Sequence, residues 1–352
     1  MSNRKRRRKQ KRMASILLIV VALVLVAGVA AYMFLSNKDD SVDTALGSAT
    51  EKISNVASSV KTENTTSTSS NGDIYEGFLA GNEKMSFSYY MSGDSLSIHE
   101  NSLDYELFAK LANKEYTLPE LVDGMNTIFT DPDGFYAPQK ISKMSYAYLD
   151  CGKDGNKELA LEFVCPIVEE ESTLTMIIKE MDGKLQLVHS FDSWSRGDAS
   201  INEYGYVTSG GSGGAALHYF EGGYIDASGK YNFAYSEEDY SGVDAFAMTF
   251  DHTDFNTDIE ALSLEGMAEI FTLRTKPSTT EDYMPEKYAY TVDGSTNPNL
   301  EDTYKEVMSC FTDITFMSYT DMMKIETERN NAVGATDDII AGNPVEFKDF
   351  SL

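Results

Sequence analysis

The sequence predicts an α+β domain, an antiparallel β-meander sheet with flanking helices, preceded by one N-terminal transmembrane helix. Three observations lead to this fold class. An uncharged apolar run covers residues 13–35, and apolar residues at helical spacing occur near residue 75 and again after residue 260. Between them, short alternating segments follow one another across turns rich in Gly and Asp. Consecutive strands joined by short turns usually pair as neighbours, so a meander is the economical topology.

The N-terminus joins a basic tail to the apolar run. Residues 1–12 contain eight Lys or Arg and no acidic residue. A helix over residues 13–35 rises about 1.5 Å per residue, enough to cross a hydrocarbon core about 30 Å thick. Basic flanks stay inside the cell, so we expect a cytoplasmic tail and an extracellular remainder. A signal peptide cleaved after the small residues before Ala31 is the alternative, and the uninterrupted length favours a retained anchor.

The remainder of the chain is strongly acidic. Beyond residue 12, 21 basic residues stand against 56 acidic ones, a formal net charge of −35. Such a surface repels phosphate, which argues against a nucleic-acid partner and favours cations, cationic polymers or basic protein surfaces. The chain has three cysteines, a low and odd number that argues against a disulfide framework. Cys151 and Cys165 flank one predicted strand that is too long for a bridge between its ends, so free thiols are expected.

Residues 36–72 predict a stalk and linker. The segment is rich in Ser, Thr, Asn and Asp and ends in TENTTSTSSNGD, a composition typical of a solvated tether. Within it, apolar residues follow a heptad-like 4-3-4-3-4 spacing: Val42, Leu46, Ala49, Ile53, Val56 and Val60. Two interpretations stay open. Residues 42–60 form either a helix that pairs two copies of the chain or a marginal isolated helix diluted by Ser and Thr.

The extracytoplasmic α+β domain is expected over residues 73–352. A short helix is predicted around Tyr75, Phe78 and Leu79, and TLPELVDGMNTIF predicts another with Thr117 as cap and Pro119 in its first turn. Helical spacing returns in LEGMAEIFTL (residues 264–273) and NLEDTYKEVMSCF (residues 299–311). Strands are predicted in KMSYAYLD, ELALEFVC, the hairpin STLTMIIKEMDGKLQLVHSF about Asp182–Gly183, ASINEYGYVTS, GAALHYFEGGYIDASGKYNFAYSEE, DAFAMTFD and YAYTVDG.

A partial β-propeller is the alternative architecture. The turns DGK at residues 182–184 and SGK at residues 228–230 lie 46 residues apart, near the length of one blade. One interval does not establish a repeat, and about 170 residues of strand are too few for four blades together with the helices. We therefore prefer the α+β sheet.

The stretch YLDCGKDGNKEL, residues 148–159, is the candidate metal site. Aligned on a calcium loop of the EF-hand type, it places Gly155 at the sixth position, where the chain turns sharply. Gly152 at the third position and Leu161 at the twelfth contribute no acid. The loop predicts either a weak Ca²⁺ site or a tight turn whose Asp and Asn side chains bind local backbone N–H groups. Its candidate ligands are Asp150, Asp154, Asn156 (by its carbonyl) and Glu158.

The same stretch carries a resemblance. YAYLDCGKDGNKELAL resembles the D-x-D-G-x-x-E-L signature of a mostly uncharacterised family of exported and surface proteins from clostridial (Firmicutes) bacteria, which is similar to FG-GAP-type loops. Many of those proteins also have a Y-x-x-F-L-x-G element upstream, present here as Tyr75, Phe78, Leu79 and Gly81. The resemblance covers about residues 75–235. It implies a surface or secreted protein of a Gram-positive bacterium and implies no reaction.

One short motif suggests catalysis. SGGSGGAAL matches the nucleophile-elbow pattern G-x-S-x-G at Gly210, Ser212 and Gly214. An elbow requires a strand-to-helix turn and a His further along the chain, but His218 is too close in sequence and His252 is the only later one. Parallel βαβ units are not expected, so we interpret the motif as a Gly-rich connection between strands. A carboxylate pair in the 148–159 loop lacks a cleft across which to act.

Aromatic residues are dense in the predicted strands: Tyr204, Tyr206, Tyr219, Phe220, Tyr224, Tyr231, Phe233 and Tyr235. If several of them face solvent, they would stack on sugars or form a protein-binding face. The alternative is that every second one fills the core and the rest stiffen the sheet.

Anchor, stalk, acidic domain and lack of a catalytic constellation together predict a single-pass cell-membrane protein. Its extracellular domain is expected to be a non-catalytic binding or recognition module of the bacterial envelope, with an envelope protein or glycan as ligand. The alternatives are an envelope hydrolase acting on glycans or esters and a structural component of an envelope complex.

Overall fold

The computed structural model describes residues 72–92, 103–131, 139–242, 246, 268–277, 284–292, 311 and 314–351. All of them belong to the compact unit of residues 65–352. The predicted anchor (13–35), the seam (42–60), the strand DAFAMTFD apart from Phe246 and the helix NLEDTYKEVMSCF apart from Phe311 lie outside the described residues. Within the described part, no helix is both long and apolar enough to cross a membrane.

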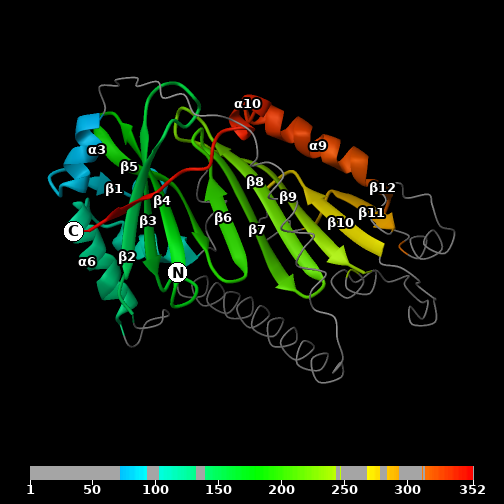
Figure 1. Cartoon of the computed structure of the whole chain (residues 1–352), viewed down its shortest axis with the longest axis horizontal. Helices are drawn as coiled ribbons and strands as arrows, with labels where there is room; N and C mark the ends of the chain where they lie inside the picture. Colours follow the sequence, from blue (N-terminus) through cyan, green and yellow to red (C-terminus); the bar gives the residue numbers. More distant parts are fainter. Residues whose placement is uncertain are drawn as a thin grey trace, which may run out of the picture. The chain divides into compact units, whose positions relative to one another are not determined.

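The first sheet, named sheet A, contains six strands and supports three helices (Figure 1). The meander of β2 to β5 is antiparallel, β1 pairs parallel with β5 at one edge, and β13 pairs antiparallel with β2 at the other. The order is β1 (Met85–Ser86), β5 (Lys184–Ser193), β4 (Ser172–Met181), β3 (Glu158–Cys165), β2 (Lys143–Leu149) and β13 (Lys348–Phe350). The helices are α3 (Gly72–Leu79), α5 (Leu103–Leu111) and α6 (Leu118–Phe129).

The helices pack on one face of sheet A because the alternation of each strand places its larger apolar residues there. Leu159, Leu161, Phe163 and Cys165 of β3 all belong to this helix-side core, as predicted. Helix α6 begins with a capping box, in which the Thr117 hydroxyl accepts from the backbone N–H of Glu120 while the Glu120 carboxylate accepts from that of Thr117.

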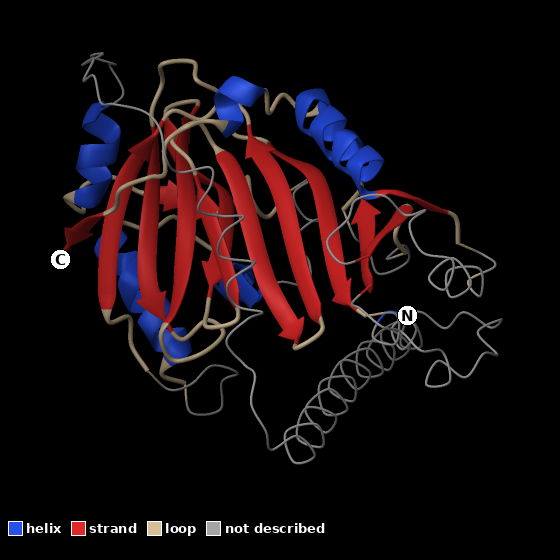
Figure 2. Ribbon diagram, turned by 45° about the vertical axis from the view of Figure 1, so that its right-hand side comes forward, coloured by secondary structure: helices blue, strands red, loops and turns tan. Residues whose placement is uncertain are grey.

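The second sheet, named sheet B, contains seven strands. Strands β6 to β11 form an antiparallel meander and β12 pairs parallel with β11. The order is β12 (Phe316–Ser318), β11 (Lys287–Val292), β10 (Ala268–Arg274), β9 (Tyr231–Ser241), β8 (Leu217–Ile225), β7 (Tyr206–Gly214) and β6 (Gly197–Ile201). One face carries α9 (Tyr319–Ala332) and the short α10 (Asp337–Ile340), both drawn beside this sheet in Figure 2.

The other faces of the two sheets share a core. Ile177 and Val188 of sheet A pack with Val207, Ile225 and Phe233 of sheet B. The C-terminal strap, defined as residues 341–350, runs from α10 to the outer edge of β2 (Figure 1). Its Val345 and Phe347 pack against the inter-sheet core, and its Phe350 packs against the helix-side core of sheet A.

The α+β prediction is confirmed at the level of class, and the meander is distributed over two mixed sheets rather than one. Sheets of six and seven strands differ from the four-stranded blades of the propeller alternative. The helices around Tyr75 and after Thr117 are confirmed, as is the hairpin at Asp182–Gly183, whose two residues both have positive φ. Cys151 and Cys165 are free, as predicted, and both are buried. Burial raises the pKa of the Cys165 thiol to about 12.

The helix predicted in LEGMAEIFTL is wrong, because residues 268–274 form β10, an interior strand of sheet B. Cross-strand pairing with both β9 and β11 buries Ile270, Phe271 and Leu273 on its two faces. A short apolar run fits a helix face and a doubly covered strand equally well. Here the neighbouring strands decide the outcome.

Candidate functional site

The predicted calcium loop is a junction between the two sheets. The N–H of Asp150 donates to the carbonyl of Glu203 (2.8 Å), and the N–H of Gly152 donates to that of Tyr204 (3.1 Å). Gly152 has φ +84°, and a Cβ there would lie 2.5 Å from the backbone nitrogen of Ala227. Glycine is therefore required for conformation and for space, because two turns of sheet B press against the loop.

Glu158 holds this junction from inside. Its side chain is fully buried, and its two oxygens accept from different donors: the backbone N–H of Cys151 (2.8 Å) and the ammonium group of Lys179 on β4. Burial raises the pKa of Glu158, and the Lys179 ammonium acts in the opposite direction. Burial and the neighbouring Glu158 raise the pKa of the Cys151 thiol well above its usual value, so this thiol stays protonated.

The other candidate ligands also bind their own turn. Asp150 Oδ1 accepts from the N–H of Gly155 (2.9 Å), while Asp154 accepts from the backbone N–H (2.8 Å) and the side-chain amide (3.0 Å) of Asn156. Nowhere in the described part do three or more His, Cys, Asp or Glu side chains form a group that could hold a metal ion. Calcium binding by Asp150, Asp154, Asn156 and Glu158 stays a prediction.

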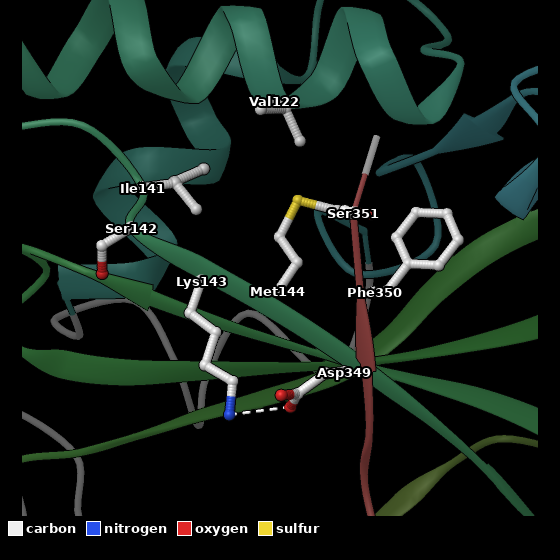
Figure 3. Close-up of a pocket in the computed structure, with 8 residues that line it drawn as sticks. All are labelled: Val122, Ile141, Ser142, Lys143, Met144, Asp349, Phe350 and Ser351. Carbon is white, nitrogen blue, oxygen red and sulfur yellow. Dashed lines mark ion pairs between the residues drawn. The ribbon is translucent and has the colours of Figure 1, made fainter.

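An open cleft of about 400 Å³ lies between α6 and the β2–β13 edge of sheet A (Figure 3). Met144 and Phe350 lie on the α6 side of the strands, together with Val122 and Ile141. At its rim, the Lys143 ammonium pairs with Asp349 at 2.7 Å. The cleft thus combines an apolar floor with one exposed ion pair. Sequence inspection missed it because its lining residues come from three segments up to about 230 positions apart.

Ser212 lies in strand β7, so neither the elbow geometry nor the predicted Gly-rich connection is found. The glycines of this strand fit because neighbouring aromatic rings cover them: a Cβ on Gly211 would lie 2.5 Å from the Tyr219 ring. The Ser212 hydroxyl donates to the carbonyl of Gly214 (2.8 Å). Its cross-strand neighbour is His218, which sequence distance had argued against, and His218 in turn opposes Asp239 on β9. His252 lies outside the described residues.

The aromatic residues divide between two environments. Tyr206, Tyr224, Tyr231 and Phe233 are buried, whereas the other four are partly exposed. Half of the set therefore lies in the core. The partly exposed rings are Tyr204, Tyr219, Phe220 and Tyr235.

A buried acidic cluster joins α5 to β5. Asp104 is 2% exposed and accepts from the hydroxyls of Tyr90 (3.1 Å) and Ser190. Burial and the negative charge of Asp104 raise the pKa of nearby Asp192 to about 6. No sequence signal pointed to this cluster, because its members are separated by up to about 100 residues and become neighbours only when α5 packs on the sheet.

No protein-family model matches the chain, and neither the curated proteins nor the solved structures gave a match. The proposal for its function therefore rests on the geometry of the described residues.

Proposed function

We propose that this chain is a membrane-anchored binding module of the bacterial envelope, with a non-catalytic α+β domain held outside the cell by residues 13–72. The observation that carries the proposal is the cleft between α6, β2 and β13. Four apolar side chains with one polar pair at the rim are typical of a site that takes an apolar group and orients it by a few polar contacts. A protein segment with an apolar anchor residue fits this chemistry.

The charged pair in the cleft favours binding over proton-transfer chemistry. The hydrogen bond and the charge interaction that the Lys143 ammonium makes with Asp349 raise the pKa of Lys143. A permanently protonated amine does not serve as a general base at neutral pH. Both side chains are more than half exposed, so ligand approach costs little desolvation of the pair.

Peptide display on the full-length chain in nanodiscs tests the proposal. Peptides selected from a random library are expected to bind at least tenfold more weakly to Val122→Lys, because the new charge enters the apolar floor. Thr127→Lys, on the exposed side of the same helix, is the matched control and is expected to bind normally. Failure to select any peptide, or binders indifferent to Val122→Lys, would contradict the proposal.

The hydrolase alternative is tested on the same preparation. Glycan and ester substrates are expected to remain intact. Turnover that disappears in Ser212→Ala would show that the domain is catalytic.

Calcium binding in the 148–159 loop is a separate proposal. A ligand that binds only the folded state raises the melting temperature. Millimolar Ca²⁺ is expected to raise it for the unmodified chain and not for Asp154→Asn. An unchanged melting temperature at that concentration rules out the site.

A further inference from the structure

We propose that the α9-side face of sheet B binds a saccharide that carries an amino group. The surface, named the β6–β9 platform, consists of two adjacent cross-strand rows. One row is Ser212, His218 and Asp239; the other is Asp198, Gly210, Phe220 and Glu237. This platform is distinct from the α6–β2–β13 cleft and does not depend on it.

Strand register places each row on one face. Directly opposed residues of antiparallel strands point to the same side, with Cβ atoms about 4.5–5.5 Å apart. Ser212 opposes His218, and His218 opposes Asp239. In the next row, Gly210 opposes Phe220. The face is that of Tyr206 and Tyr224, which follow at even spacing along β7 and β8 and pack with Ala335 and Ile339 beside α10.

The described helices leave these rows outside their packing clusters. Residues of and around α9 and α10 pack with Tyr206 and Tyr224 at one end of the sheet and with Phe271, Leu273 and Ala289 further along it. Within the rows, Asp198 is exposed, and Ser212, His218, Phe220 and Asp239 are all partly exposed. The second row meets α9 at its buried end, where the Glu237 carboxylate accepts from the Tyr319 hydroxyl at 3.4 Å.

Phe220 provides the stacking surface. A Cβ on Gly210 would lie 3.2 Å from its Cδ1 atom, so the ring occupies the space that a side chain at Gly210 would fill. The ring consequently leans along the sheet across β7. Sugar rings pack their C–H faces on aromatic rings held in this way, and a single large ring with fixed orientation loses little entropy on binding.

Polar groups around the ring match a polyhydroxylated ligand. Ser212 and His218 provide donors and acceptors in one row, and Ser200 and Thr208, whose hydroxyls lie 3.1 Å apart, continue the same face on the other side of Phe220. Hydroxyl, imidazole and carboxylate groups are the polar set that orients a sugar beside an aromatic ring.

Charge decides which saccharide is favoured. Asp198 and Asp239 stand on opposite sides of Phe220, at the β6 and β9 ends. The exposed Arg196, whose carbonyl accepts from the N–H of Ser212, extends the first row at the β6 edge, and the three carboxylates of the two rows (Asp198, Glu237 and Asp239) outnumber it. Beyond residue 12 the whole chain carries a formal charge of −35. An ammonium group on the ligand is therefore attracted both by the two carboxylates and by the field of the domain.

Calorimetric titration of the full-length chain in nanodiscs tests the proposal with three probes: a glucosamine hexamer, an N-acetylglucosamine hexamer and cellohexaose. The glucosamine hexamer is expected to bind at least tenfold more tightly than either uncharged probe. Phe220→Ala is expected to weaken this binding at least tenfold. Asp198→Asn is expected to weaken the binding of the glucosamine hexamer at least threefold. Because this variant changes only an exposed side chain, such a loss of affinity would reflect a role in binding rather than misfolding.

Two control variants separate the platform from general charge attraction and from the cleft. Asp182→Asn removes the same charge at the exposed β4–β5 turn, where Asn also accepts a positive φ, and is expected to leave the affinity unchanged. Val122→Lys disrupts the cleft and is expected to leave it unchanged as well. Equal binding of the three probes, no binding, or equal losses in Asp198→Asn and Asp182→Asn would overturn the proposal.

Discussion

Glu158, a candidate calcium ligand in the sequence, fixes the geometry of its own loop through two buried contacts in the structure. Its carboxylate binds a backbone N–H of its own loop and the Lys179 ammonium of the next strand. Taking both charges out of water costs free energy that their attraction and hydrogen bonds offset only when both partners are present. The pair is therefore more important for local geometry than for net stability.

Removing one partner of this pair should be costly. Lys179→Met leaves the Glu158 carboxylate buried without its cation, and we expect the free energy of unfolding to fall by about 3–5 kcal/mol. Urea unfolding measures the change. Lys184→Met removes the exposed pair with Glu115 and should cost no more than about 1 kcal/mol. Similar small losses in both variants would show that the Glu158–Lys179 pair is not buried as described.

Because of Asp192, we expect the folded state to be more stable at acidic pH than at neutral pH. Its folded pKa of about 6 lies above the unfolded value of about 3.9, so the folded state binds the proton more tightly. Its contribution is fully present below pH 4 and is lost as the pH rises through 6. Allowing for solvent screening, we expect a loss on the order of 1–2 kcal/mol over this interval. Asp192→Asn should flatten the unfolding free energy between pH 4 and 7; an unchanged slope contradicts the assignment.

Sequence reasoning at this scale succeeds where partners are local. Asp150 and Asp154 bind backbone groups within five residues, and a turn of this kind can be inferred from Asp, Asn and Gly alone. Lys179 and Asp104 could not be connected to their partners, because those contacts exist only after strands and helices from distant parts of the chain have packed.

At the scale of elements, the Gly-rich strand β7 shows that composition can mislead. Gly and Ser predict a flexible connection, yet rings from β8 lie across Gly210 and Gly211 and complete the sheet surface. Such cross-strand covering of glycine by an aromatic ring is a recognised way to stabilise a strand that lacks side chains.

Alanine substitutions in this strand test the covering rings. A methyl group at Gly211 would meet the Tyr219 ring at 2.5 Å, so Gly211→Ala is expected to cost about 1–3 kcal/mol of unfolding free energy. Gly214 has no heavy atom within 4 Å of the added Cβ, so Gly214→Ala should be neutral or slightly stabilising. Thermal unfolding of both variants gives the comparison, and equal effects would contradict the role of Tyr219.

Elements with a strong local pattern were predictable, and those shaped by their neighbours were not. Helix α6 has a cap, an early proline and a regular apolar stripe, and β3 has large apolar residues at every second position from Leu159. Helix α9 buries Met322, Glu326 and Asn330 at intervals of four residues. Two of these three are polar, so no apolar stripe marked the helix in the sequence.

At the scale of the whole molecule, the inter-sheet core and the C-terminal strap make the two sheets interdependent. At the loop junction the backbone N–H of Glu203 donates to the carbonyl of Asn343, and the backbone N–H and side-chain amide of Asn343 both donate to the Glu203 carboxylate. Phe347 then packs against residues of both sheets. These contacts join sheets A and B at the same place as the 148–159 loop. We therefore expect the two sheets to unfold together.

Truncation of the strap side chain tests this coupling. Phe347→Ala is expected to lower the free energy of unfolding by about 1–3 kcal/mol and to leave a single transition. Glu346→Ala, exposed on the same strap, should change it by no more than about 0.5 kcal/mol. Tyrosine fluorescence and circular dichroism should give coincident transitions. Separate transitions for the two signals would show that the sheets fold independently.

The position of β13 has a consequence for biosynthesis. A chain is made from its N-terminus, so β2 exists long before the last residues that pair with it, about 200 positions later. Until then the outer edge of β2 presents unpaired backbone groups, the kind of edge through which nascent chains associate wrongly. Completion of sheet A must therefore wait until residues 348–350 have been made, and chains that stop before residue 348 retain an exposed, association-prone edge.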